Sequence, residues 1–509
     1  MSHCLLKPIS ILLCFALAGV PAGAAIADGV QKDGMEPAID QYIDQVRASG
    51  KIPGVAIAIV QGEETIFLKG YGVAGGNRPV TPQTPFTICS VGKTFTAFAI
   101  RQLAAQGKVD YDEPVQAYIP WFELADPGSA SQITIGDLIS HKSGLSRESG
   151  TQSWLYDPNL TLEDAVRRLK SVHPAHPAGS SEEYSNLNFV LLGLVIQAVS
   201  GMPYEDYIQS NVFEPLGMAH SYLHDAEARK DGSAAGYSVA YGIPIPLDIP
   251  QPKGMTPAGF QQTCAEDLAK FAKLYLNNGY LNGKSVFAEN PLPEQKPPFE
   301  KYDNSTPRYG IYWMPESGPV GGYQGYYGHE GRSSNFSTML MVNPYSKRAI
   351  IVLTNCVNGA YDPPLNAATI ANDIAAMLEM HTGLPQRTAG YGSKWINTVA
   401  LGAVILLLAL RFFWISRFRR NLARGKGRRA AAVISYALLD GALPLAALVS
   451  LPMIFQTPWP VILGNNPELG ILILLVCPAL LSVFAAKTII LIITRAKAHS
   501  KEAAETGHT

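Results

Sequence analysis

Three long apolar runs near the C-terminus constrain the fold of this chain more than any other feature. Residues 395–415, 430–455 and 469–493 are each about 20 residues long or more, which is enough to cross a bilayer. A polar, glycine-containing stretch, 383–394, separates them from the rest of the chain. The sequence therefore predicts three transmembrane helices joined by a linker to a large N-terminal region. Asp440 lies inside the second run, either with a function of its own or buried against neighbouring helices.

The loops between these runs differ in charge. The loop after the first run is rich in lysine and arginine, the loop 456–468 has neither, and the tail 494–509 is basic again. Because positively charged loops stay in the cytoplasm, this alternation places the first loop and the tail inside and the N-terminal region outside. The basic residues of the first loop are Arg417, Arg419, Arg420, Arg424, Lys426, Arg428 and Arg429.

The first residues of the chain agree with this orientation. Residues 1–27 contain Lys7, an apolar core from Ile9 to Val20 and small residues before Asp28, which is the pattern of a secretory signal peptide. The alternative is an uncleaved N-terminal anchor, although the apolar core is short for a span. We therefore expect a multi-pass membrane protein whose domain 28–382 lies on the periplasmic or extracellular face.

Charge and cysteine usage exclude several classes of function. The chain has 40 basic and 41 acidic residues, and this balance argues against nucleic acid as the main partner. Its six cysteines are scattered and form neither a disulfide framework nor a metal-binding spacing. At most one bridge could form among Cys89, Cys264 and Cys356. We expect no metal and no cofactor.

The N-terminal region shows strand patterns at both ends and helix patterns between them. This order predicts one α/β (α+β) domain whose sheet is assembled from distant parts of the chain. A charged, proline-rich stretch, 289–307, is expected to be an exposed loop. The predicted helices are 35–48, 91–106, 186–200, 203–212 and 265–277, and the predicted strands are 55–60, 65–68, 309–314, 335–342 and 348–353.

Ser90 and Lys93 are the first candidates for catalysis. Ser90 precedes the predicted helix 91–106, and Lys93 lies three residues on, so both side chains share one helix face. A lysine desolvated at a helix N-terminus could have a lowered pKa and take the proton of the serine hydroxyl. The simpler interpretation is a capping serine followed by an exposed lysine. A nucleotide-binding loop is excluded because position 87 is Thr where that motif needs Gly.

Two further clusters carry polar side chains suited to a site. Tyr184 and Asn186 come just before or at the start of the predicted helix 186–200, and a tyrosine phenol near a lysine can carry a proton. The alternative is a core aromatic residue followed by a helix cap. The other cluster is the run from Gly328 to Arg332, directly before the last predicted strands; it could equally be an ordinary polar turn.

Taken in order, these motifs resemble the serine β-lactamase and penicillin-binding protein superfamily, in particular the branch related to class C β-lactamases. That branch also holds D-Ala-D-Ala carboxypeptidases, D-amino-acid peptidases and esterases. The motifs are Ser90-Val91-Gly92-Lys93, Tyr184-Ser185-Asn186 and His329-Glu330-Gly331, supported by the landmarks His141 to Leu145, Pro215 to Met218 and Pro257 to Gly259. The resemblance covers residues 35–378. It implies an antiparallel sheet flanked by helices beside a mostly helical region, with the site between them.

The resemblance also implies a role for each residue. Ser90 is expected to be the acylated nucleophile, with Lys93 and Tyr184 sharing general-base and general-acid work. Asn186 is expected to bind the acyl amide of the substrate, and the backbone N–H groups of Ser90 and Arg332 to form the oxyanion hole. His329, Glu330 and Gly331 are expected to line the substrate site.

The third motif departs from the family pattern. Many members have Lys-Thr/Ser-Gly, whereas His329 and Glu330 stand here, so no fixed cation awaits a substrate carboxylate. If Glu330 faces the site, it repels such a group. We therefore expect hydrolysis of an ester, a D-amino-acid peptide or another amide. The alternatives are a weak or inactive penicillin-binding-like sensor of cell-wall fragments and a true β-lactamase.

Overall fold

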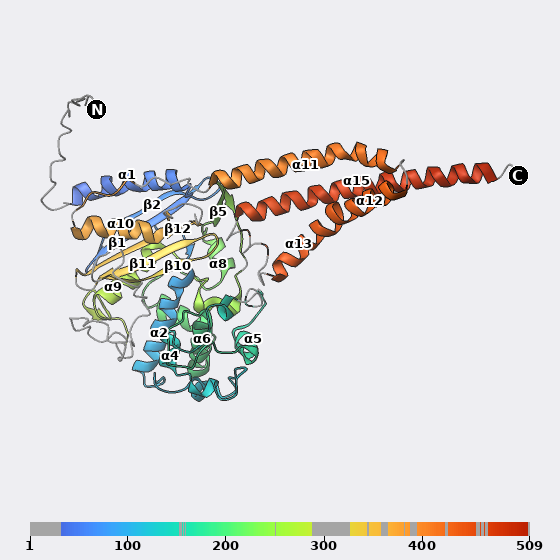
Figure 1. Cartoon of the computed structure of the whole chain (residues 1–509). Coiled ribbons are helices and arrows are strands. Elements are labelled where there is room, and N and C mark those ends of the chain that lie inside the picture. The colour runs from blue at the N-terminus through green and yellow to red at the C-terminus, as the bar shows by residue number, and fades with distance from the viewer. Residues whose placement is uncertain are drawn as a thin grey trace, which may run out of the picture.

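The structure is a computed structural model of the whole chain, shown in Figure 1. The signal peptide, the loop 289–307 and the strand 309–314 predicted from sequence lie outside the residues that it describes. The described residues are 32–506 apart from 152–154, 156, 158, 250, 288–325, 344–345, 358–364, 381, 387–393, 423–425, 455–458, 460–462 and 464–466.

A six-stranded sheet forms the centre of the N-terminal domain. Its strand order is β10-β11-β12-β1-β2-β3, and every neighbouring pair is antiparallel. The early strand β1 pairs with the late strand β12, with Val55 opposite Thr354, which confirms a sheet built from distant parts of the chain. The strands are β1 (Gly54–Gln61), β2 (Glu64–Gly75), β3 (Arg78–Pro79), β10 (Tyr327–Arg332), β11 (Ser337–Asn343) and β12 (Arg348–Thr354).

Helices cover both faces of this sheet (Figure 1). Helices α1 (Lys32–Gly50) and α10 (Ala367–Met380) pack on one face, in a core that contains Ile57, Met339 and Ile350. Helix α9 (Ala265–Leu276) packs on the other face, whose core contains Leu340 and Ile351. Side chains along a strand alternate between the two faces, so these two cores define which residues point to which side.

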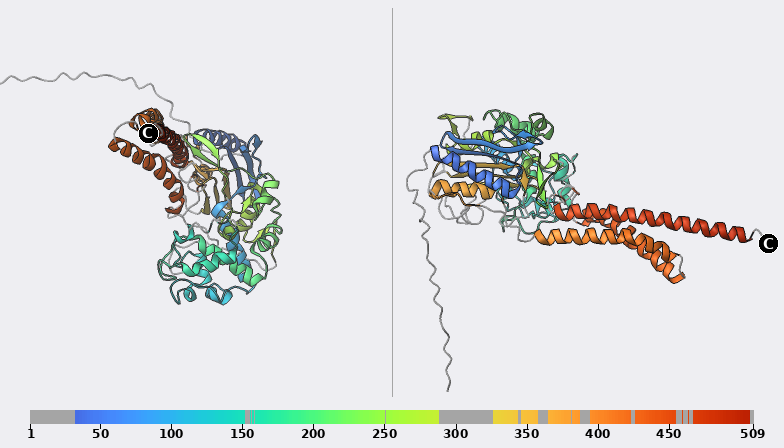
Figure 2. Two further views of the ribbon diagram at one scale, coloured as in Figure 1. Left: turned by 90° about the vertical axis from the view of Figure 1, so that its right-hand side faces the viewer. Right: turned by 90° about the horizontal axis from the view of Figure 1, so that it is seen from above.

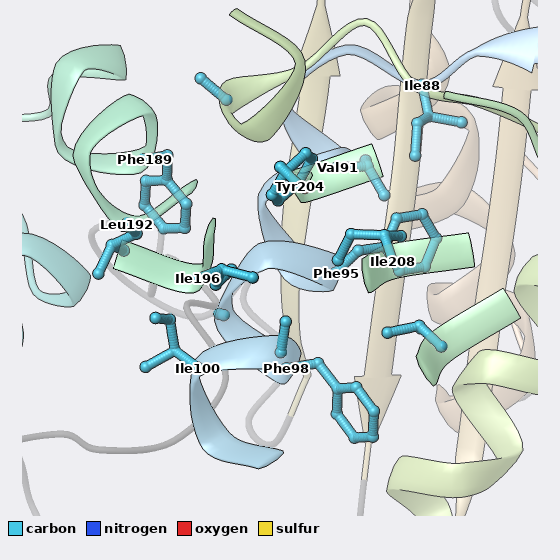
Figure 3. Packing of buried hydrophobic residues seen from close by; sticks show 14 of the residues in the cluster. Ile88, Val91, Phe95, Phe98, Ile100, Phe189, Leu192, Ile196, Tyr204 and Ile208 are labelled. Atoms are coloured by element: carbon cyan, nitrogen blue, oxygen red, sulfur yellow. The ribbon is translucent and has the colours of Figure 1, made fainter. Parts of the chain in front are cut away.

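Helix α2 (Lys93–Ala105) joins the sheet to the helical region (Figure 3). Phe95 lies edge-on to Phe213 and Phe271, with ring centroids 5.1 and 4.7 Å apart, a geometry that adds to the burial energy of aromatic residues. The helical region around α2 consists of α3 (Val115–Tyr118), α4 (Ile135–Ile139), α5 (Leu162–Arg167), α6 (Asn186–Ser200) and α7 (Tyr204–Ile208), which continues as a π-helical turn Gln209–Phe213.

Shorter elements complete the domain. Strand β4 (Phe86–Thr87) pairs with β7 (Gln262–Thr263), and β8 (Tyr280–Leu281) pairs with β9 (Lys284–Ser285). A three-stranded sheet has the order β13-β5-β6, formed by β5 (Tyr237–Ala240), β6 (Ile243–Pro246) and β13 (Cys356–Val357). Helix α8 (Asp225–Lys230) precedes it.

Three long helical segments leave the domain side by side (Figure 2). Among the described residues, Leu401–Leu422, Arg429–Ile454 and Pro467–Ser500 are long and apolar enough to cross a membrane. They belong to α11 (Lys394–Leu422), to α12 (Lys426–Tyr436) with α13 (Leu443–Ile454), and to α15 (Pro467–Thr506). A π-helical segment, Ala437–Ala442, joins α12 to α13 and buries Asp440 completely.

Candidate active site

Ser90 lies in a short 3₁₀ turn, η1 (Cys89–Gly92), directly ahead of α2. The sequence placed Ser90 at or just before the first helical turn, as a possible cap, but the residue before α2 is Gly92 and no side chain caps the helix. The hydroxyl of Ser90 is instead the acceptor for two other side chains. Lys93 Nζ donates to Ser90 Oγ over 3.2 Å, and Tyr184 Oη donates to the same oxygen over 2.8 Å.

Lys93 is completely buried, which rules out the simpler interpretation of an exposed lysine. Besides Ser90, its Nζ donates to Asn186 Oδ1 over 2.8 Å and to the carbonyl oxygen of Ala258. It also lies 5.0 Å from the centre of the Tyr184 ring. Burial lowers the pKa of Lys93 well below its usual value, because the charged form loses its hydration.

Tyr184 and Asn186 reach Lys93 from the start of α6. Asn186 is the first residue of this helix, and the cap position is occupied by Ser185, so the alternative of Asn186 as a cap is wrong. The Asn186 amide spans the site, since its Oδ1 accepts from Lys93 and its Nδ2 donates to Gly150 O over 3.4 Å. Burial raises the pKa of Tyr184 to about 12, so the phenol keeps its proton at neutral pH.

His141 holds the segment that carries Tyr184. The backbone N–H of Ser185 and the amide of Asn188 both donate to His141 Nδ1, over 3.1 and 2.8 Å. The imidazole packs against Tyr184, with ring centroids 4.6 Å apart. His141 is buried and its backbone is left-handed, with φ of 54°. From sequence this residue was noticed only as part of a landmark, because its partners are distant in the chain.

The third motif is a strand rather than the polar turn considered from sequence. It forms β10, the edge strand of the sheet, in which His329 lies opposite Leu340 and Gly331 opposite Thr338. Leu340 belongs to the core on the α9 side of the sheet. Thr338 Oγ1 donates over 2.7 Å to the carbonyl oxygen of Ile88, which precedes Ser90 by two residues in the chain. His329 and Gly331 therefore face the site. A Cβ on Gly331 would come within 2.1 Å of Ile88 O, so only glycine lets the strand approach this closely.

Glu330 and Arg332 point to the other face of β10. Glu330 lies opposite Met339, which belongs to the core under α1 and α10, and its Oε1 accepts a hydrogen bond from Asn366 Nδ2 over 3.4 Å. The hypothesis that Glu330 faces the substrate is therefore not supported. The cause is the two-residue period of the strand, which sends His329 and Glu330 to opposite sides. Arg332 follows the same alternation as Glu330.

The charges at the site differ from those that the residue types suggest. Burial and the neighbouring Lys93 lower the pKa of His329 to about 3, so its imidazole is neutral at physiological pH. Burial also lowers the pKa of His141 well below its usual value. Arg147, which the sequence did not single out, is an exposed cation at the rim, with its guanidinium carbon 5.3 Å from the centre of the Tyr184 ring.

The described cysteines take no part in covalent links. Cys89, Cys264, Cys356 and Cys477 are all free and buried. Burial raises the pKa of Cys89 to about 12, so this neighbour of Ser90 stays a thiol. In the described part of the chain, no three His, Cys, Asp or Glu side chains come close enough together to hold a metal ion.

A family model for β-lactamase matches residues 39–373. Among curated proteins, Protein flp of Staphylococcus aureus (strain COL) is 28% identical over 436 residues, which is 84% of this chain and 83% of that protein. A match of this extent cannot end before the C-terminal helices begin, so the likeness includes part of them.

Two other similarities are restricted to a smaller part of the chain. Unguisins hydrolase ungD' of Aspergillus campestris is 27% identical over 345 residues, covering 64% of this chain and 62% of that protein. Among solved structures, the octameric penicillin-binding protein homologue of Pyrococcus abyssi superposes with a TM-score of 0.56 and 26% identity. That superposition covers 69% of this chain and 79% of the other.

Proposed function

Because the chain belongs to the β-lactamase family, we propose that it is a serine hydrolase that acts through an acyl-enzyme and is anchored in a membrane with its active site outside the cytoplasm. One observation carries this proposal: Ser90 Oγ lies within hydrogen-bonding distance of both Lys93 Nζ and Tyr184 Oη. A nucleophile in contact with a candidate base is the arrangement that covalent catalysis requires.

The proposed reaction begins with loss of the Ser90 proton. A neutral Lys93 has a lone pair for this proton while it still donates to Asn186 and Ala258, and Ser90 Oγ forms a bond to the carbonyl carbon of the substrate. Tyr184, whose phenol stays protonated, passes a proton to the leaving alcohol or amine and recovers one from Lys93. Water then cleaves the acyl-enzyme with the same groups acting in reverse.

The remaining residues of the site would bind and orient the substrate. Asn186 offers its amide to the acyl group, and the backbone N–H groups of Ser90 and Arg332 would stabilise the developing oxyanion. Because His329 is neutral, the wall of the site that carries a lysine in many members of this family offers no fixed charge here. We therefore propose neutral esters, D-amino-acid peptides or other amides as substrates, and only slow hydrolysis of β-lactams.

Labelling of the nucleophile tests this function. A fluorophosphonate or fluorescent-penicillin probe should label the full-length protein, and Ser90→Ala should abolish the label while leaving the melting temperature unchanged. A panel of esters, D-peptides and β-lactams then identifies the substrate class. Parent protein that stays unlabelled by every probe, although folded, would show that Ser90 is not a nucleophile.

A second candidate is a non-hydrolytic sensor that binds cell-wall fragments. The observations that favour it are the likeness to a penicillin-binding protein homologue and the three apolar helices next to the domain. The two functions differ in turnover. A sensor would be labelled at Ser90 but would release no product from the panel, whereas a hydrolase would release product repeatedly.

A further inference from the structure

The hairpin formed by β5 and β6 has an unusual turn. Its two connecting residues are Tyr241 and Gly242, both left-handed, with φ of 50° and 77°. Two-residue hairpins of this kind favour Asn, Asp or Gly at both positions, and a bulky residue such as tyrosine is uncommon in this conformation. The contacts of Tyr241 must therefore compensate for the less favourable backbone.

Those contacts are with the start of the last apolar helix. The Tyr241 backbone N–H donates to Glu468 Oε1 over 3.1 Å, and the Tyr241 hydroxyl donates to Glu468 O over 3.2 Å. Glu468 is buried and is the second residue of α15. Figure 1 shows β5 beside the end of α15 that is nearer to the domain. The turn is thus fixed to the end of a candidate membrane span.

Strand β6 exposes two large apolar side chains next to this turn. Ile243 is 63% exposed and Ile245 is 36% exposed, and their two-residue spacing puts them on the same face of the strand. Pro244 and Pro246 alternate with them on an edge strand, where proline discourages pairing with other strands. Edge protection explains the prolines, but it does not explain two exposed isoleucines.

The isoleucines lie close to the level at which α15 becomes apolar. Its exposed apolar surface begins at Leu469, directly after Glu468. Ile243, the first residue of β6, is two residues from Tyr241 in the chain and therefore lies at most about 7 Å from it, and Ile245 is two residues further along the strand. Tyrosines are enriched where a span meets the lipid headgroups, because the ring is apolar and the hydroxyl polar.

We propose that the β5–β6 hairpin is a membrane-contact surface, in which Ile243 and Ile245 lie against the headgroup region of the bilayer. We choose a lipid surface as the partner of the hairpin because of the contact between Tyr241 and Glu468. This contact joins the hairpin to the start of α15, the helix that is proposed to enter the bilayer. This inference rests on the proposed membrane anchoring. It adds a second point of attachment, which restricts how the domain tilts relative to the membrane.

Fluorescence quenching in vesicles tests the contact. The full-length protein, with Cys4 and Cys14 replaced by Ser, is reconstituted in phosphatidylethanolamine–phosphatidylglycerol vesicles and labelled with an environment-sensitive fluorophore at one introduced cysteine. The positions are Ile243→Cys, Ile245→Cys, Ile489→Cys on α15 as the membrane reference and Tyr280→Cys on β8 as the aqueous reference. Ile489 and Tyr280 are 57% and 43% exposed, so all four positions accept a label.

The expected result is a gradient with depth. Quenchers attached near the lipid headgroup should quench the label at 243 strongly, at 245 less and at 280 hardly at all, while quenchers attached to the acyl chains act on 489. If 489 is quenched but 243 resembles 280, the hairpin does not touch the membrane, although the anchoring holds. If 489 is also unquenched, the anchoring fails and the inference fails with it.

A second measurement avoids disturbing the turn with a label. Hydroxyl-radical oxidation of unlabelled protein should modify Ile243 and Ile245 several-fold less in vesicles than after transfer to a lipid-free amphipathic polymer. Oxidation of Tyr280 should be equal in both. Equal oxidation of the isoleucines in vesicles and polymer would overturn the proposal.

Discussion

At the scale of single residues, burial decides the chemistry of Lys93. A surface ammonium keeps its proton at neutral pH, but Lys93 is enclosed completely and loses hydration on all sides. Its partners at Ser90, Asn186 and Ala258 are two side-chain oxygens and a carbonyl, none of which carries a charge. Ser90 and Lys93 could be identified from their spacing, whereas the carbonyl of Ala258 and the imidazole of His141 could not, because both come from distant parts of the chain.

Replacing Lys93 should abolish acylation without unfolding the domain. Lys93→Met keeps most of the side-chain volume and removes the base. The rate of Ser90 labelling should therefore fall by a factor of about 10²–10⁴. Lys93→Ala should lose the same activity and also stability, because it leaves a cavity. The measurements are the rate of fluorophosphonate labelling and the melting temperature. Labelling of folded Lys93→Met at the parent rate would exclude Lys93 as the base.

The pH dependence of acylation should report Lys93 and not His329. Lys93 must be neutral to accept a proton, so kcat/KM should fall as the pH drops through its lowered pKa. The pKa of His329, about 3, leaves this residue neutral throughout the range from pH 4.5 to 9. We therefore expect the fall in kcat/KM at low pH, measured with a neutral ester, to have the same midpoint in the parent and in His329→Gln. A limb near pH 6.5 that disappears in His329→Gln would contradict this assignment.

Glu330 should have little influence on substrate charge. From sequence, its carboxylate was expected to repel an acidic substrate, but β10 directs it to the α10 side, where Asn366 donates to it. For a matched free acid and methyl ester, the ratio of kcat/KM values should change less than about threefold in Glu330→Thr and in Glu330→Gln, which is under about 0.7 kcal/mol. A tenfold gain for the acid in both variants would show that the carboxylate reaches the substrate.

At the scale of elements, the sequence predicted the strongly apolar segments well and the others poorly; the strand predicted at 65–68, for example, runs from Glu64 to Gly75. Helix α6 has the predicted bounds, and β12 differs by a single residue, because strong apolar patterns define both. Two junctions were misjudged. The segment from Tyr327 to Arg332 is rich in glycine and polar residues, which suggests a turn, yet pairing with β11 makes it a strand. The π-helical turn after α7 likewise follows from packing that no local pattern reveals.

The buried ion pair between two apolar helices should matter for their assembly. Lys487 Nζ lies 2.5 Å from Asp440 Oδ2, and Arg411 lies 3.5 Å from the other carboxylate oxygen. Removing one partner of a buried pair leaves an uncompensated charge, at a typical cost of about 3–5 kcal/mol. Asp440→Leu should therefore make the reconstituted protein more sensitive to SDS unfolding.

The matched control removes both charges of that pair. Asp440→Leu combined with Lys487→Leu should be more resistant to SDS than Asp440→Leu alone, because no lysine is then left unpaired. SDS titrations followed by fluorescence measure both variants. Equal resistance of the single and double variants would mean that Lys487 finds another partner and that the pair does not hold the helices together.

At the scale of the whole molecule, one end of the helical segments is joined to the domain. Helix α11 begins at Lys394, at the end of the predicted linker that follows the domain, and Glu468 at the start of α15 is hydrogen-bonded to Tyr241 of the β5–β6 hairpin. If these segments span a membrane as proposed, the first residues of α11 and of α15 lie on the same side of the bilayer as the domain. The similarity to Protein flp covers 84% of this chain and therefore extends into the first of these helices.

Reporter fusions should locate the loops on opposite sides of the membrane. If three spans follow an external domain, the arginine-rich loop lies inside, the loop before Glu468 lies outside and the tail lies inside. The positive-inside rule predicts the same arrangement from the charges of the loops alone. A fusion after Arg420 should activate a reporter that works only in the cytoplasm, and one after Pro460 a reporter that works only outside. A fusion at the C-terminus is the control and should behave like Arg420. If Arg420 were outside, the topology would be reversed and Ser90 would lie in the cytoplasm. That result would contradict both the predicted signal peptide and the proposed extracytoplasmic substrate.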